Sequence, residues 1–203
     1  MKRSARIAGI IASAVILFTG WYALAPSTYT SIPSSKLWVE GTSTMHDFTC
    51  QVATFEGIFN TNVDMGDAIA GLMDVEVTVP VDELKCGNGT MDKKMREALK
   101  ADDHKEIRYE MTDVAIEPAA TAGVYQLKAK GNLTLAGAQR PIDIAVEGTQ
   151  LADGTIRFVG STVVKMSDFG IKRPSAALGT IKTGDDVTVR FEVVAAANEI
   201  AGR

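Results

Sequence analysis

Few residues of this sequence have the types and spacing that catalysis requires. His46 and His104 are the only histidines, so a zinc site with three imidazole ligands is excluded. His46 is followed by Asp47 where a strand is expected to begin, and the two side chains could form a local hydrogen-bonded pair. A structural or surface histidine is the simpler interpretation, because histidine has many roles outside catalysis.

Two further segments suggest chemistry. SDFG at residues 167–170 contains the Asp-Phe-Gly of protein kinases, but the chain has no glycine-rich phosphate loop and no catalytic-loop motif. We interpret it as a turn after a strand, in which the apolar side chain of Phe169 fills space between neighbouring elements. Asp102, Asp103 and Glu106 form an acidic group that fits a solvated helix end, because carboxylates are mostly exposed. With no Gly-x-Ser-x-Gly elbow either, we expect no enzymatic activity, no metal and no cofactor.

Cys50 and Cys86 are the two cysteines of the chain. An even number of cysteines in an oxidising compartment favours a disulfide, with two buried free thiols as the alternative. The bond would close a loop of about 36 residues, for which the chain-entropy model gives roughly 3–4 kcal/mol of stabilisation.

The first 25 residues form a unit of their own. Three basic residues precede an uncharged, mostly apolar stretch at residues 7–25, which is the layout of a secretory signal. Residues 23–25 (ALA) have the small-x-small form of a cleavage site, although Pro26 directly after it disfavours cleavage. The length of the stretch is also close to the roughly 20 residues that a helix needs to span a bilayer. The sequence is therefore consistent with cleavage after residue 25 and with retention of the stretch as a membrane tether. Either outcome exports the remaining chain to the periplasm or cell envelope.

The rest of the chain divides into a linker at residues 26–35, rich in Ser, Thr and Pro, a folded domain at 36–197 and a tail at 198–203. Removing residues 1–25 removes three positive charges and changes the formal charge from −4 to −7. An acidic domain with scattered basic residues lacks the electrostatic footprint of a nucleic-acid-binding protein.

Alternation of apolar and polar residues dominates the folded domain and predicts half-buried antiparallel strands. The clearest runs are residues 73–79, 107–112, 125–130, 142–147 and 187–193. Weaker strands are expected near residues 36–43, 46–59 and 155–165. The total is about eight, a number that suits a barrel.

One segment departs from this alternation. Residues 90–101 place Met91, Met95 and Leu99 at helical spacing, and Thr90 suits the N-cap. They predict one short amphipathic helix between two strands.

Eight alternating strands fit either a sandwich or an up-and-down barrel, and the short connections favour the barrel. An eight-stranded barrel is either filled by side chains or just wide enough for one small ligand, and spacing alone does not decide between these interiors. The alternation directs fifteen side chains inward, and these are Phe48, Val52, Val75, Val77, Val79, Ile107, Tyr109, Met111, Leu127, Leu133, Ile142, Ile144, Val146, Val189 and Phe191.

Three stretches give the chain from about residue 36 to residue 195 a resemblance to the YceI family of lipid- or polyisoprenoid-binding proteins with lipocalin-like shape. They are TMHDF at residues 44–48 with FEGIF at 55–59, MDKKM at 91–95 with HKEI at 104–107, and GNLTLAG at 131–137 with RPI at 140–142 and SDFGI at 167–171. The last combination is the most specific.

The resemblance implies a hollow barrel that holds an isoprenoid or another lipid-like amphiphile. It implies that the fifteen inward residues bind the ligand together with Phe169, and that the helix covers one end with Met91, Met95 and Leu99 facing the ligand. A Cys50–Cys86 bond would then pin the segment before the helix to a barrel strand. Oligomeric state is left undetermined.

Two other functions compete with a carrier. An enzyme acting on a lipid would use His46, Asp47 or Asp168 as acid or base. A solid barrel would instead act in the envelope through its surface contacts with another protein.

Overall fold

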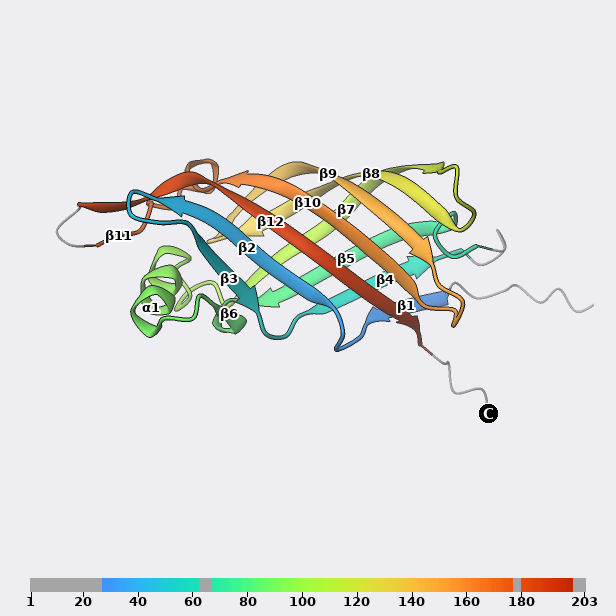
Figure 1. Ribbon diagram of the computed structural model, residues 1–203, viewed down its shortest axis with the longest axis horizontal. Helices are drawn as coiled ribbons and strands as arrows, with labels where there is room; N and C mark the ends of the chain where they lie inside the picture. The colour runs from blue at the N-terminus through green and yellow to red at the C-terminus, as the bar shows by residue number, and fades with distance from the viewer. Residues whose placement is uncertain (1–26, 63–66, 177–179, 199–203) are drawn as a thin grey trace, which may run out of the picture.

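Antiparallel strands make up most of the computed structural model, which describes residues 27–62, 67–176 and 180–198 (Figure 1). The strands are β1 (Ser27–Ser31), β2 (Lys36–Ser43), β3 (Phe48–Val52), β4 (Glu56–Thr61), β5 (Leu72–Pro80), β6 (Leu84–Lys85), β7 (Glu106–Pro118), β8 (Val124–Leu135), β9 (Ala138–Gln150), β10 (Ile156–Lys165), β11 (Ser175–Ala176) and β12 (Ile181–Ala197). The helical elements are η2 (Val81–Glu83), α1 (Gly89–Ala98) and η3 (Met166–Phe169).

The barrel has eight strand positions around its wall, and three of them are each filled by two consecutive strands. β1 and β2 follow one another along β12 and both pair with it. The next position is shared by β4, which pairs with β1, and β3, which pairs with β2. The third is shared by β5, which pairs with β4, and β6, which pairs with β3. β7 to β10 and β12 complete the circuit in sequence order, and β11 adds a short ladder to β12. The predicted eight-stranded up-and-down barrel is confirmed, although the strand expected near residues 46–59 is divided into β3 and β4.

The expected linker at residues 26–35 is wrong, because most of it is the first barrel strand. In β1 the side chain of Tyr29 is buried, with 8% of its surface exposed. The hydroxyl of Thr28 donates to Asn60 Oδ1 at 2.9 Å across the ladder to β4. The segment lacks a clear alternation signal because Tyr29 is the one apolar residue in STYTS. Within the described residues, the barrel therefore includes Ser27–Ser31 and begins before residue 36.

One end of the barrel is sealed by its own chain. β1 begins and β12 ends there, on the right of Figure 1. Residues 67–71, which precede β5, pack at this end, and Ile69 has none of its surface exposed. The carboxylate of Asp67 holds that turn, because it accepts from the N–H of Ile69 at 2.9 Å and from the hydroxyl of Tyr125 at 2.8 Å. This end is called the closed end below.

The helix α1 lies at the opposite end, on the left of Figure 1. The predicted helix is confirmed, but its N-cap is Asn88 and not Thr90. The Asn88 side chain accepts from the N–H groups of Thr90 and Met91 at 2.9 and 3.3 Å, which satisfies two of the helix's free donors. The helix ends at Ala98 and contains no buried residue. This end is called the mouth below.

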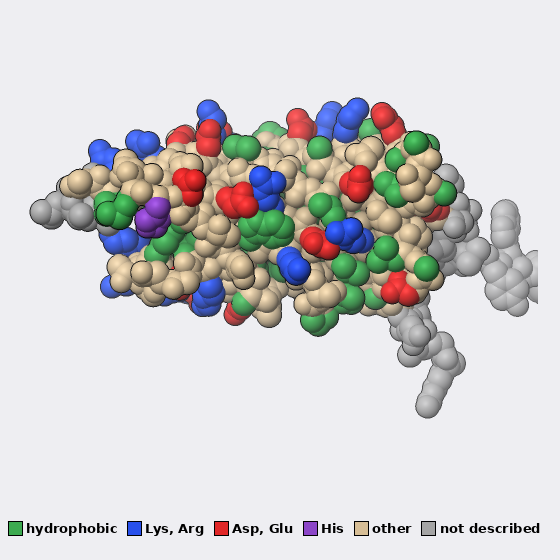
Figure 2. All heavy atoms as spheres, in the orientation of Figure 1, with side chains coloured by type: hydrophobic (Ala, Val, Ile, Leu, Met, Phe, Trp, Pro, Cys, Tyr) green, Lys and Arg blue, Asp and Glu red, His purple; other side chains and the backbone are tan. Residues whose placement is uncertain are grey.

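The outer face of the wall carries both signs of charge. Acidic and basic side chains are interspersed over the face shown in Figure 2. Some of them pair across neighbouring strands, as Arg157 does with Glu192 and Arg190 with Glu40, each at 2.8 Å. Among the described residues, no helix is long and apolar enough to cross a membrane. The N-terminal stretch at residues 7–25 lies outside the described residues.

Candidate ligand-binding cavity

The barrel encloses a cavity of about 510 Å³ that is lined by α1 and by strands around the wall. This volume lies within the range of about 300–1,000 Å³ that is usual for small-molecule sites. The cavity extends from the mouth as far as Leu72, Val114 and Val193, and Ile69 and Ile156 lie beyond it with none of their surface exposed. The interior is therefore hollow, and the alternative of a solid barrel is contradicted.

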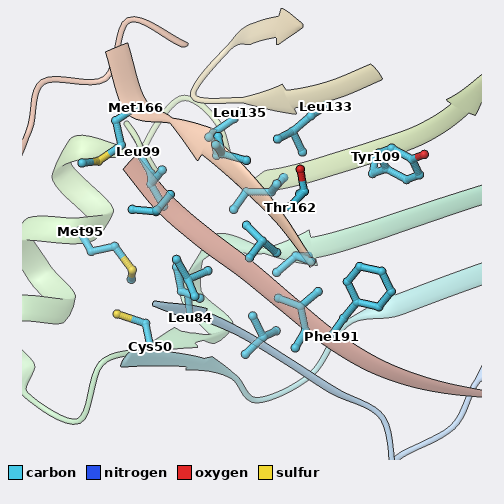
Figure 3. Close-up of a pocket in the computed structure, with 18 of the residues that line it drawn as sticks. Cys50, Leu84, Met95, Leu99, Tyr109, Leu133, Leu135, Thr162, Met166 and Phe191 are labelled. Atoms are coloured by element: carbon cyan, nitrogen blue, oxygen red, sulfur yellow. The ribbon is translucent and has the colours of Figure 1, made fainter. Parts of the chain in front are cut away.

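All fifteen side chains that the alternation directs inward line this cavity, and so do the three predicted lid residues Met91, Met95 and Leu99. Met95 of α1 and Leu99, which directly follows the helix, point toward the strands in Figure 3. Alternation therefore locates the cavity wall correctly, because successive side chains of a strand must face opposite sides of the sheet.

Phe169 is the exception among the predicted ligand residues, because it does not line the cavity. Its side chain is 3% exposed and packs into the hydrophobic cluster around the mouth. The β9–β10 ladder ends at the pair Ala145 and Ser161. η3 contacts β9, β10 and β12 beyond that point, where Arg140 Nε donates to the carbonyl of Asp168 at 3.1 Å. Phe169 thus fills the wall where β9 and β10 separate.

Several lining residues were missed in the sequence. Val187, Val193 and Leu135 lie two residues from inward residues that were chosen on the same strands. Extending the alternating pattern by one more inward position along each strand therefore finds them. Others come from β2 and β10, where the signal is weaker, and from the segments around η3; they include Leu37, Val39, Phe158, Val164, Met166 and Ile171.

Two aromatic rings lie flat against the wall because the neighbouring strand has glycine beneath them. A Cβ placed on Gly160 of β10 would lie 2.5 Å from Cζ of Phe191, its cross-strand partner on β12. A Cβ placed on Gly131 would lie 2.4 Å from Cε2 of Tyr109. Both rings lie on the side of the cavity away from α1 (Figure 3). The glycines therefore keep the deep part of the cavity open.

Polar atoms are scarce in the deep cavity. The hydroxyl of Thr162 donates to the carbonyl of Asp143 at 3.2 Å, close to where the β9–β10 ladder ends. The hydroxyl of Tyr109 is buried and has no hydrogen-bond partner among the described residues. Burial, with a contribution from the charge of Asp143, raises the pKa of Tyr109 to about 12. Tyr109 is thus neutral at physiological pH and adds no charge to the cavity.

The predicted disulfide is confirmed, since Cys50 and Cys86 are bonded. The bond joins β3 to the segment between β6 and α1, and both cysteines line the cavity. The N–H of Cys86 also donates to Asp92 Oδ1, in the first turn of α1, at 2.7 Å. The covalent and polar contacts together hold α1 over the mouth.

Only two of the described lining residues have side chains that carry a positive charge or can acquire one, and none is acidic. They are Lys94 on α1 and His46 on the turn between β2 and β3, both at the mouth. Of the three residues that the enzyme hypothesis offers as acid or base, His46 lines the cavity and Asp47 and Asp168 do not. The described residues also contain no cluster of three or more potential metal ligands of the His, Cys, Asp and Glu types.

A closed, eight-stranded antiparallel barrel around an apolar cavity is the architecture of the lipocalin-like class of proteins. A family model for the YceI-like domain matches residues 26–195. The chain therefore belongs to the YceI-like domain family.

Three solved structures share this fold. A polyisoprenoid binding domain from Saccharophagus degradans, implicated in plant cell wall breakdown, is 15% identical with a TM-score of 0.65, over 86% of this chain and 100% of that one. BcnA of Burkholderia cenocepacia is 18% identical with a TM-score of 0.63, over 80% and 97%. A YCEI protein of Campylobacter jejuni is 19% identical with a TM-score of 0.57, over 74% and 84%. A comparison with curated proteins found no match.

Proposed function

We propose that this protein is an exported carrier that holds one isoprenoid or similar lipid-like chain inside its barrel. The observation that carries the proposal is the cavity of about 510 Å³, whose deep part is lined almost entirely by apolar side chains. Each CH₂ group that leaves water contributes about 0.8 kcal/mol, so a long chain binds well without specific polar contacts. The shape and length of the cavity then select the ligand.

Two further observations support parts of this proposal. The related domain of Saccharophagus degradans is described as binding polyisoprenoids. The Cys50–Cys86 disulfide suits an oxidising compartment and so supports export, as does the signal-like stretch at residues 7–25. We propose that the protein binds its ligand without converting it, because no carboxylate occurs in the part of the cavity lining that the structure describes.

Native mass spectrometry of the full chain, purified from its own host, tests the proposal. We expect the protein to retain an apolar molecule, and the same spectrum reports whether residues 1–25 are still present. Val77→Trp, in the cavity wall, should displace that molecule because the indole occupies its space. Val163→Trp is the matched control, because Val163 is 59% exposed on the outside of the barrel.

A protein that carries no apolar molecule in any preparation would contradict the proposal. So would a Val77→Trp variant that melts as the parent does and still retains the ligand fully. Val189→Trp, on another strand of the same cavity, repeats the test if Val77→Trp does not fold.

A further inference from the structure

The charges around the cavity indicate which head group its ligand carries. The described lining contains one lysine and one histidine and no Asp or Glu, in a chain whose formal charge is −4 overall. Both residues lie at the mouth, so the deep cavity receives the apolar chain and the mouth receives any polar group. The described lining therefore offers a cationic head group no carboxylate with which to form an ion pair.

Lys94 differs from the other two basic residues of α1. Lys93 is 3.9 Å from Glu97, and Arg96 is 3.8 Å from Asp82. Lys94 has no carboxylate within ion-pair distance among the described residues, and it is the one basic residue of the helix that lines the cavity. Its ammonium donates to the carbonyl of Ser175 on β11. An ammonium has three N–H donors, so this bond leaves two for a ligand.

Most other polar groups at the mouth are already engaged. Asn88 caps α1, and the hydroxyl of Thr183 donates to the carbonyl of Pro174 at 3.3 Å. The hydroxyl of Ser43 donates to the carbonyl of His46 at 2.7 Å. The ring of His46 contacts the carbonyl of Asp47 through Nδ1 at 2.9 Å, and because a carbonyl only accepts, Nδ1 carries the proton. Lys94 is therefore the strongest free donor at the mouth.

We propose that the ligand is an acidic amphiphile whose carboxylate or phosphate head binds Lys94 at the mouth while its chain fills the barrel. Lys94 lines the cavity while its ammonium is held at the carbonyl of Ser175, and lysine in general can cover apolar surface while keeping its charge hydrated. A charge-assisted hydrogen bond to an anion is stronger than one to a neutral group. This inference rests on the proposed function and adds the class of head group.

Displacement of the neutral dye Nile red from the full chain tests this preference. The competitors are hexadecanoate, hexadecyl phosphate, hexadecanol and hexadecylamine, which share one chain and differ in head group. At neutral pH we expect at least one of the two anions to displace the dye at about tenfold lower concentration than hexadecanol, as a charge-assisted bond requires. Hexadecylamine should be the weakest competitor. The stronger of the two anions identifies the head group as carboxylate or phosphate.

The Lys94→Gln variant should lose the preference for anions and bind hexadecanol as the parent does. Lys94→Arg should keep the preference, and so should Lys93→Gln, the matched control one residue away on the outer face of the helix. Equal displacement by the anions and hexadecanol would overturn the inference and leave the carrier function intact. Equal weakening of all four competitors by Lys94→Gln would also overturn it. If none of the four displaces the dye, the carrier function itself fails.

Discussion

The two ends of the barrel are closed in different ways. At the closed end, Ile69, Ile156 and Ala195 have no exposed surface and pack into a continuous core. At the mouth, α1 contains no buried residue, and its Met91 and Met95 pack half-buried against a second hydrophobic cluster. The Cys50–Cys86 bond and the contact of Cys86 with Asp92 add covalent and polar restraints there. The difference shows how one barrel can combine a fully packed end with a cover that packs only partly and is fixed by a covalent bond.

The largest contrast is expected between Ile69→Ala at the closed end and Met95→Ala at the mouth. Ile69→Ala should lower the free energy of unfolding by about 2–5 kcal/mol, because it leaves a cavity in a densely packed core. Met95→Ala should cost less than about 1 kcal/mol, because α1 contains no buried residue. Denaturant unfolding of both variants measures the difference. Equal losses would show that the two ends are not stabilised differently.

Removal of the disulfide should affect the mouth more than the closed end. Cys50→Ser with Cys86→Ser releases a 36-residue loop, and the chain-entropy model predicts a loss of roughly 3–4 kcal/mol. Ligand should also dissociate faster, because the segment before α1 is no longer pinned to β3. Thermal melting and ligand retention are measured for the double variant and for the parent in its oxidised and reduced forms. Unchanged melting and retention in both would reject the pinning role.

Gly160→Ala tests whether glycine keeps the deep cavity open. The new Cβ would lie 2.5 Å from Phe191 Cζ and 2.9 Å from the carbonyl oxygen of Ala145. We expect a loss of about 1–3 kcal/mol from overpacking, with the Phe191 ring displaced into the cavity and long chains bound more weakly. Gly89→Ala is the control, because a Cβ at Gly89 has no neighbour within 4 Å. Unaltered binding of long and short chains by Gly160→Ala would contradict this role.

The smallest effect is expected from Tyr109→Phe. It removes a buried hydroxyl without a partner, so the free energy of unfolding at neutral pH should stay within about 1 kcal/mol of the parent or rise slightly. The folded-state pKa of Tyr109 is raised from 10.0 to about 12, so its contribution is fully present below pH 10 and is lost as the pH rises to about 12. The parent should therefore lose stability relative to Tyr109→Phe across that interval, so that the difference between the two free energies of unfolding shifts in favour of the variant. Parallel curves would contradict the raised pKa.

The sequence predicts the wall of this barrel better than its ends. Val75, Val77 and Val79 alternate with polar residues, and a sheet with one apolar face requires this pattern. The same rule misses β1, where Tyr29 alone is apolar, and misplaces Phe169, whose direction is set by the separation of β9 from β10. Alternation also gives no measure of how far opposite walls are apart. A hollow interior therefore depends on the family resemblance in the sequence and on the cavity in the structure.

The position of β12 has a consequence for the order of events during folding. Residues 195–197 pair with β1 and residues 183–192 with β2, so strands from the two extremes of the domain close the barrel. Contacts between such distant segments form late, because the chain must first lose the entropy of a long loop. Among the described strands of the barrel, β12 is also the last to be synthesised. The wall of the cavity is complete only after this strand has docked, so a ligand carried as proposed would enter a finished barrel and would not act as a template for the assembly of the other strands.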